Sequence, residues 1–236
     1  MPEFLRGEEA LASGSFSCLK FIARGDVRFL LLLMPFALIA GCANSPVSKA
    51  VLDLSHAVIP GAATAPIRLN PAFSYLRVQV ENREVYFALG YQDRSPAGTV
   101  EVWYSAGGEV LRLRDGRVVG ASGMKTEWLA VRLEGLPDWN AIGARAEFIR
   151  QRDVSPGYRY GLREAMSIYP IAPPPRTHLK DIDPDKLNWF EEVASASSGL
   201  PMARYAMQNI SGKTVVIYSE ICLDADLCFS WQRWHA

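Results

Sequence analysis

Residues 100–118 read Val-Glu-Val-Trp-Tyr-Ser-Ala-Gly-Gly-Glu-Val-Leu-Arg-Leu-Arg-Asp-Gly-Arg-Val. Apolar side chains recur at every second position, and such positions share one face of a β-strand. The segments Ala106-Gly107-Gly108 and Asp115-Gly116 interrupt this pattern with residue types that tolerate positive φ in tight hairpin turns. The stretch therefore predicts three consecutive antiparallel strands.

The same period of two continues on both sides of this stretch. We predict that one apolar face is formed by Leu76, Val78, Val80, Val85, Phe87, Leu89, Val100, Val102, Tyr104, Leu111, Leu113, Leu129, Val131 and Leu133. Further strands are expected at 144–152 and 158–169, with Leu162, Met166 and Ile168 facing inward, and at 204–210, 214–221 and 227–234. These strands favour an up-and-down arrangement.

One segment is expected to depart from the β pattern. Asp183-Pro184 resembles a helix N-cap followed by proline at the first helical position. Leu187, Phe190 and Ala194 then recur at intervals of three and four, which predicts a helix from Pro184 to about Ala196. The predicted fold is all-β and mainly antiparallel, a barrel or a two-sheet sandwich with one short covering helix, in a single domain over residues 73–236.

The N-terminal region resembles a lipoprotein signal. An apolar run at 29–40 follows Lys20, Arg24 and Arg28 and is shorter than the about 20 residues that a membrane-spanning helix needs. The run ends in Leu38-Ile39-Ala40-Gly41-Cys42, which resembles the bacterial lipobox. We expect cleavage before Cys42 and acylation of that cysteine, rather than a buried helix that Pro35 would kink.

This interpretation divides the chain into a signal region (1–41), a lipidated tether (42–72) and the β domain. A helix at Val47–Ala57 is expected in the tether, and Ala43 after the cysteine favours the outer membrane by resemblance to the enterobacterial sorting rule. Residues 1–26 carry acidic residues unlike the basic front of a signal peptide, so we expect translation to begin later, at Val27.

Two cysteines lie in the part expected to reach the periplasm. Cys222 and Cys228 are close in sequence in a compartment that permits disulfides, which favours a bond between them. Free thiols or a thiolate metal site are the alternatives, but no C-x-x-C motif or histidine cluster accompanies these residues.

Charge and motifs give no reason to expect catalysis, a cofactor or nucleic acid. Lys plus Arg and Asp plus Glu each total 25. The three histidines, His56, His178 and His235, are expected on the surface, and G-x-S-x-G, H-E-x-x-H and phosphate-loop motifs are absent from the sequence.

One set of acidic residues has the spacing of a calcium-binding loop: Asp181, Asp183, Asp185 and Glu192. Lys186, however, stands where that loop needs glycine. Helix capping explains the aspartates, and Glu191-Glu192 is expected on a solvated helix face.

Carbohydrate binding stays open at this point. The sequence has six Trp and nine Tyr, and sugars stack on flat aromatic faces, but aromatic residues also fill β cores. The pattern favours core or interface packing for Tyr75, Trp103 and Trp128. Two arginine pairs, Arg112 with Arg114 and Arg159 with Arg163, each share a strand face, and we expect them on a solvated outer surface.

Several segments resemble the YjbF/GfcB family of lipoproteins. They are residues 101–117 running into Gly123-Met-Lys-Thr-Glu-Trp128, Tyr75-Leu-Arg-Val before Ala88-Leu-Gly-Tyr91, and Ile221-Cys-Leu-Asp-Ala-Asp-Leu-Cys-Phe-Ser-Trp-Gln-Arg-Trp234. The resemblance spans residues 70–234, and only the long N-terminal extension departs from the family pattern.

The resemblance implies an outer-membrane lipoprotein on the periplasmic face that acts as a non-catalytic accessory factor in secretion or assembly of an exopolysaccharide, such as a group-four capsule. The implied partners are an outer-membrane β-barrel protein and a periplasmic protein of the same export system, and the polysaccharide itself. It implies no catalytic residue, cofactor or metal. Two alternatives remain: a glycan-binding or glycan-modifying enzyme of the periplasm, and a carrier for a lipid or lipidated glycan.

Overall fold

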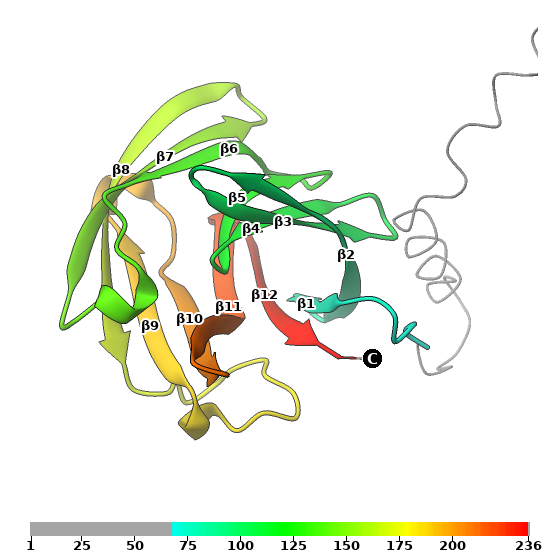
Figure 1. Ribbon diagram of the computed structural model, residues 1–236. Helices are drawn as coiled ribbons and strands as arrows, with labels where there is room; N and C mark the ends of the chain where they lie inside the picture. The colour runs from blue at the N-terminus through cyan, green and yellow to red at the C-terminus, as the bar shows by residue number, and fades with distance from the viewer. Residues whose placement is uncertain (1–67, 236) are drawn as a thin grey trace, which may run out of the picture. The chain divides into compact units, whose positions relative to one another are not determined.

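Short turns between the alternating runs let each strand pair with the next, as the computed structural model shows for residues 68–235, the part of the chain that it describes (Figure 1). The strands are β1 (Tyr75–Val80), β2 (Arg83–Ser95), β3 (Gly98–Ser105), β4 (Val110–Arg114), β5 (Arg117–Ser122), β6 (Glu127–Glu134), β7 (Ala146–Ser155), β8 (Arg159–Ile171), β9 (Asn188–Ala194), β10 (Ala203–Ile210), β11 (Lys213–Asp224) and β12 (Leu227–Trp234). Three 3-10 turns join them: η1 (Trp139–Ala141), η2 (Pro184–Lys186) and η3 (Ala196–Ser198).

The first and last strands close the sheet into a barrel. β1 and β12 pair antiparallel from Tyr75↔Trp234 to Val80↔Phe229, so the ring runs without interruption through all twelve strands. Closure gives every strand of the described barrel two neighbours, although β5 and β6 pair only at Ala121↔Trp128. The all-β, antiparallel prediction is confirmed, in its barrel form.

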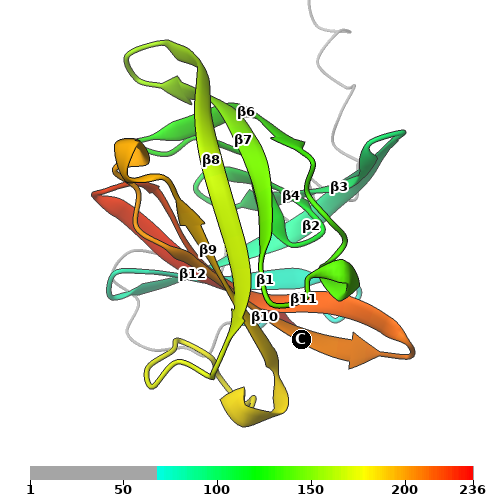
Figure 2. The same ribbon diagram turned by 90° about the vertical axis from the view of Figure 1, so that its left-hand side faces the viewer.

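The strand directions divide the connections between two ends of the barrel (Figure 2). At one end, here called the terminal end, the described chain enters before Tyr75 and leaves after Trp234, and the β2–β3, β4–β5, β6–β7, β8–β9 and β10–β11 connections lie there. The other end, here called the disulfide end, carries the β11–β12 turn and the bond between Cys222 and Cys228. The predicted disulfide is therefore confirmed.

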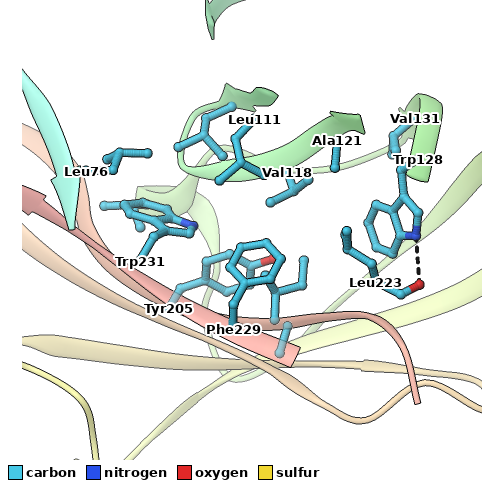
Figure 3. Packing of buried hydrophobic residues seen from close by; sticks show 14 of the residues in the cluster. Leu76, Leu111, Val118, Ala121, Trp128, Val131, Tyr205, Leu223, Phe229 and Trp231 are labelled. Atoms are coloured by element: carbon cyan, nitrogen blue, oxygen red, sulfur yellow. Dashed lines mark hydrogen bonds between the residues drawn. The ribbon is translucent and has the colours of Figure 1, made fainter. Parts of the chain in front are cut away.

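The barrel interior is filled by large side chains from all around the ring (Figure 3). Trp103, Trp128, Trp231 and Tyr205 are each no more than 1% exposed. The Trp128 Nε1–H donates to the Leu223 carbonyl oxygen at 2.9 Å, so the indole hydrogen-bonding group is satisfied within the core. The predicted inward faces of β1, β2, β4 and β8 are confirmed by the members of this cluster.

Two predicted inward faces need correction. In β3, Trp103 and Ser105 face inward, while Val102 pairs with the outward Arg112. In β6, a bulge between Trp128 and Ala130 places Trp128 and Val131 inward, and Leu129 is 40% exposed on the outside. A bulge inserts one residue and reverses the side on which the following residues lie, and strict alternation cannot reveal this.

The predicted helix from Pro184 to Ala196 is wrong. Asp183 does cap a helical turn, since its carboxylate accepts a hydrogen bond from the Asp185 N–H at 3.1 Å. This turn, η2, is only three residues long. The chain then continues as β9. Leu187, just before β9, packs outside the barrel, whereas Phe190 and Ala194 of β9 pack inside it. Apolar residues on two faces of the extended chain therefore have the same spacing as one apolar stripe of a helix.

Residues 172–187, here called the strap, cover an apolar part of the outer face formed by β9, β10 and β11. Leu179, Ile182 and Leu187 pack over Trp189, Ala206, Ile217 and Tyr218. The strap backbone is also bonded to the barrel: Arg77 Nη1 donates to the His178 carbonyl oxygen at 2.9 Å, and the Gln232 side chain both donates to and accepts from Lys180. The strap thus covers the outer side of β1 and β10–β12.

The β4–β5 turn fits so tightly against β11 that it permits a stability test. Gly116 has φ +79°, and a Cβ there would collide with the Val216 side chain. We expect Gly116→Ala to lower the free energy of unfolding by about 3 kcal/mol, from left-handed backbone strain and overpacking.

Urea denaturation measures this loss, with Gly143→Ala as the matched control. Gly143 is exposed and has no atom within 4 Å of an added Cβ, so its replacement should change the free energy by less than about 0.5 kcal/mol. Equal effects of the two substitutions would contradict the described turn geometry.

Candidate functional site

Five charged side chains are deeply buried inside the barrel, where an apolar core is the rule. They are Arg117 on β5, Arg150 and Arg152 on β7, Glu164 on β8 and Glu192 on β9, and none is more than 5% exposed. We call this set the interior ion-pair chain. Burying five charges is costly unless each is paired, so their contacts decide what the site can do.

The interior ion-pair chain alternates in sign along its length. Arg117 Nε lies 3.1 Å from Glu192 Oε2, and Glu192 Oε1 lies 3.7 Å from Arg150 Nη1. Arg150 Nε in turn contacts Glu164 Oε2 at 2.7 Å, and Arg152 Nη2 contacts Glu164 Oε1 at 2.8 Å. The contacts therefore connect β5 with β7, β8 and β9 across the interior.

The members of this chain of contacts reach toward both ends of the barrel. Arg117 is the first residue of β5, at the terminal end. Glu164 also accepts a hydrogen bond from the Ser198 Oγ–H, and Ser198 belongs to η3 in the β9–β10 connection at the disulfide end. Polar contacts thus run through the core toward both ends of the barrel.

The environment of Glu164 keeps its carboxylate ionised. Burial by itself raises the pKa of this group. The hydrogen bond from Arg152, the charge of Arg150 and the hydrogen bonds from Ser198 and Arg150 outweigh burial and lower the pKa to about 2. Glu164 is therefore a negatively charged partner for two arginines and not a proton donor near neutral pH.

Aromatic rings complete the surroundings of the arginines. The Arg117 Cζ lies 3.5 Å from the centroid of the Trp139 ring and 5.5 Å from that of Tyr205. Arg150 and Arg152 each lie 5.1 Å from the Trp128 ring. These distances are typical of cation–π contacts, which gain strength when water is excluded.

Arg117 retains one unsatisfied group. Its Nη2 is buried and has no hydrogen-bond partner. Such an atom is rare in a native interior because a buried donor without an acceptor loses its hydration energy. The interior ion-pair chain also carries three arginines against two glutamates, so it holds one positive charge in excess.

Residues 135–145, here called the cover loop, lie over Arg117 at the terminal end. Trp139 of η1 packs against Phe190 and Tyr205, at centroid distances of 5.7 and 5.2 Å. Its Nε1–H donates to the Asp115 carbonyl oxygen at 2.9 Å, and Asn140 accepts from the Thr214 hydroxyl at 2.6 Å. The cover loop is thereby attached to the β4–β5 turn and to β11.

Two adjoining hollows lie beside the cover loop, and we call them together the terminal groove. One has a volume of about 800 Å³ and the other of about 500 Å³. Both are lined by Asp115, Trp139, Lys213 and Thr214. Arg117 and Arg114 line the larger hollow, so the groove lies directly next to one extreme of the interior ion-pair chain.

A third hollow, of about 600 Å³, lies near the disulfide end. Its lining includes the Cys222–Cys228 bond, Met202 and the strap residues Arg176 and His178. Glu220, also in its lining, accepts from the Tyr218 hydroxyl at 2.7 Å and pairs with Arg204 at 3.3 Å. The carboxylate of Glu220 is therefore engaged by two side chains that lie outside this lining.

The structure does not bring together the four residues that are spaced as in a calcium-binding loop. Glu192 points into the barrel and pairs with Arg117 and Arg150, whereas Asp183 caps the exposed turn η2. The prediction that Glu191-Glu192 forms a solvated helix face is wrong, because both residues lie in strand β9 and strand alternation turns Glu192 inward. Within residues 68–235, no group of three or more His, Cys, Asp or Glu side chains could hold a metal ion.

The aromatic residues tested for sugar binding serve packing, as the sequence favoured. Trp103 and Trp128 are core residues, and Tyr75 lies in an outer cluster with Tyr86 and Ala88. The arginine pairs lie on the outer surface: Arg112 and Arg114 project opposite the inward Leu111 and Leu113, and Arg163 forms an exposed ion pair with Glu134 at 3.0 Å.

Sequence reasoning missed the interior ion-pair chain, although the strand phase carried a signal for it. Glu164 lies in the same phase as Leu162, Met166 and Ile168, which were predicted to face inward. A charged residue at an inward position indicates a buried partner of opposite sign. Arg150 and Arg152 share the phase of Phe148 in the neighbouring strand.

The proposed lipidation site Cys42, the signal region and the tether as far as residue 67 lie outside the described residues. The helix expected at Val47–Ala57 and His56 lie outside them too. In the described part of the chain, no helix has the length and apolar character to cross a membrane.

Comparison with known proteins shows a likeness in fold. No protein-family model matches the chain, and a search of curated proteins found no match. Among solved structures, the chain resembles the hypothetical lipoprotein YmcC from Escherichia coli, with a TM-score of 0.50 and 12% sequence identity over 82% of this chain and 90% of that one. At this identity the likeness concerns the fold alone.

The interior ion-pair chain allows a matched test of stability. Glu164→Gln removes the charge shared by two buried arginines, and we expect it to lower the free energy of unfolding by about 3–5 kcal/mol. Glu134→Gln is the control, because Glu134 and Arg163 form a pair with side chains 49% and 59% exposed. Its loss should cost about 1 kcal/mol or less in the same urea titration. Similar losses for both variants would refute the buried pairing.

The lowered pKa of Glu164 also predicts how this contribution varies with pH. The contribution is complete above the ordinary value of 4.5 and is lost as the pH falls through the folded value of about 2. The difference in unfolding free energy between the wild type and Glu164→Gln should therefore shrink across this window. Urea titrations at a series of pH values measure it, and a constant difference would show that Glu164 is not charged in the folded state.

Proposed function

We propose that this protein is a lipid-anchored accessory factor, without catalytic activity, in the secretion or assembly of an exopolysaccharide. The observation that carries the proposal is the lipobox-like segment Leu38–Cys42, placed ahead of a β domain whose fold is similar to that of a protein described as a lipoprotein. Acyl chains on Cys42 would hold the barrel at the membrane. The proposed location is the periplasmic face of the outer membrane.

The partners follow from the resemblance to the YjbF/GfcB family. They are an outer-membrane β-barrel protein and a periplasmic protein of the same export system. The tether 42–72 between the anchor and β1 gives the barrel room to reach such partners.

The segments that carry the resemblance build connected parts of the structure. Residues 101–117 form most of β3, all of β4 and the start of β5, and they contribute Trp103 to the core and Arg117 to the interior ion-pair chain. Residues 221–234 contribute the disulfide and β12, which closes the barrel. This distribution supports a shared architecture and not a single shared active residue.

The interior carboxylates support a role without glycoside hydrolysis. A glycosidase needs one carboxylic acid with a raised pKa and a second carboxylate across the substrate. Glu164 has a lowered pKa and is engaged by two arginines, and Glu192 is likewise paired with Arg117 and Arg150. The side chains that fill the core also argue against the carrier reading, which requires a large apolar cavity.

Gene deletion with complementation tests the proposal. We expect deletion to lower the amount of secreted polysaccharide and the wild-type gene to restore it. Cys42→Ser removes the sulfur that carries the lipid, so this variant should be found unanchored and should fail to restore secretion. Mass spectrometry of the purified protein should find Cys42 acylated at the new N-terminus.

Two outcomes would overturn the proposal. One is polysaccharide of unchanged amount and length in the deletion strain. The other is an unmodified Cys42 still joined to residues 1–41. Glu134→Gln, which touches only the exposed pair, serves as the control variant and should restore secretion fully.

A further inference from the structure

We infer that the terminal groove binds an acidic saccharide, a chain whose sugar units carry carboxylates beside their hydroxyl groups. The inference rests on the proposed function for its place in the cell, because it names the chemistry of the polymer that the accessory factor would contact.

The groove has the form of an elongated site. Its two hollows share four lining residues, and the larger extends to Ala97 in the β2–β3 turn and the smaller to Arg94 and Thr99 in the same hairpin. The tips of three hairpins and the cover loop therefore border it. Its combined extent exceeds a single sugar and suits a short stretch of polymer, and pockets of several hundred Å³ are usual for ligand binding.

Three cations of the groove have no partner in the described part of the chain. Arg94, Arg114 and Lys213 line it without forming any ion pair or side-chain hydrogen bond within residues 68–235. Arg233, also in the lining, is by contrast neutralised by Glu101 at 2.8 Å. Unpaired cations around a concave surface attract anionic groups and offer them charge-assisted hydrogen bonds.

The remaining polar groups of the lining select among anions. Asp115 and Asp138 place two carboxylates in the larger hollow, and these repel a simple anion but accept hydrogen bonds from hydroxyl groups. Thr214 and Asn140, which are bonded to each other, add a hydroxyl and an amide that can also form hydrogen bonds with the hydroxyl groups of a ligand. A ligand that meets both sets must carry acidic and hydroxyl groups together, which describes an acidic sugar better than a phosphate ion or a lipid headgroup.

The charge beneath the groove adds to its attraction for an anion. Arg117 lines the larger hollow and lies under the Trp139 ring, with its Nη2 buried and unpaired. The interior ion-pair chain to which it belongs has one arginine more than its glutamates can balance. In a medium of low dielectric constant this uncompensated charge is felt over several ångströms.

Calorimetric titration of the full protein in a neutral detergent tests the inference. The probes are an oligogalacturonate and a malto-oligosaccharide of equal length, which differ in charge but both present hydroxyl groups. We expect binding of the acidic probe, weakened by added salt, and little or no binding of the neutral one.

A pair of double variants assigns the binding to the groove. Arg114→Ala with Lys213→Ala should weaken binding of the oligogalacturonate by about tenfold or more, as expected for the loss of two charged hydrogen-bond donors. Lys125→Ala with Arg159→Ala is the matched control, because it removes the same charge from exposed positions at the disulfide end. The control should bind as the wild type does, and circular dichroism should show all three proteins folded.

The inference is overturned by any of three results. These are no binding of the acidic probe, equal binding of both probes, and equal losses in the two double variants. Competition by inorganic phosphate at matched ionic strength that abolishes binding would identify a simple anion site and overturn it as well. None of these results bears on whether gene deletion lowers secretion, so the inference can fail while the proposed function stands.

Discussion

Pairing between β1 and β12 is the constraint on which the structure depends. The two strands are the first and last of the described chain, and their ladder from Tyr75↔Trp234 to Val80↔Phe229 turns a twisted sheet into a ring. Closure brings Leu76 and Trp231 into one core with residues of β4–β6, as Figure 3 shows. The strap reinforces the same seam from outside through Arg77 and Gln232.

A closed ring of this size encloses more space than aliphatic side chains fill, and the protein fills it with indoles and long charged chains. Trp103, Trp128 and Trp231 occupy much of the volume. The arginines place their alkyl stems among them, and the guanidinium groups of Arg150 and Arg152 meet Glu164 of the neighbouring strand β8. The same side chains therefore fill the interior and pair its charges. They leave one positive charge in excess in the interior ion-pair chain, whose Arg117 lines the terminal groove.

Much of the fold could be predicted from the sequence, because a period of two with glycine-rich turns is a local signal. The disulfide was also accessible from the spacing of Cys222 and Cys228. The errors arose where tertiary structure overrides a local pattern. One is the bulge near Leu129, and the other is the junction of the strap with β9, where Leu187 packs outside the barrel and Phe190 inside it. The candidate site was not predicted. Arg117 and Glu192 are 75 residues apart, and only the closed ring brings them together. Arg150 and Glu164, by contrast, lie opposite each other in the β7–β8 hairpin, and their inward strand phase was the local signal for them.

Closure also restricts how other proteins can associate with the barrel. Many assemblies recruit a partner by β-augmentation, in which an extended peptide adds to a free sheet edge through its main chain. Every strand of the ring already has two neighbours, so this mode of recruitment has little free main chain to use except at the β5–β6 seam, which pairs only at Ala121↔Trp128. Elsewhere, recognition falls to side chains and to protruding hairpins such as β7–β8, whose Tyr158 and Tyr160 stand 76% and 63% exposed. Differences in partner specificity between such proteins would then arise from substitutions at loop tips and not from changes in strand pairing.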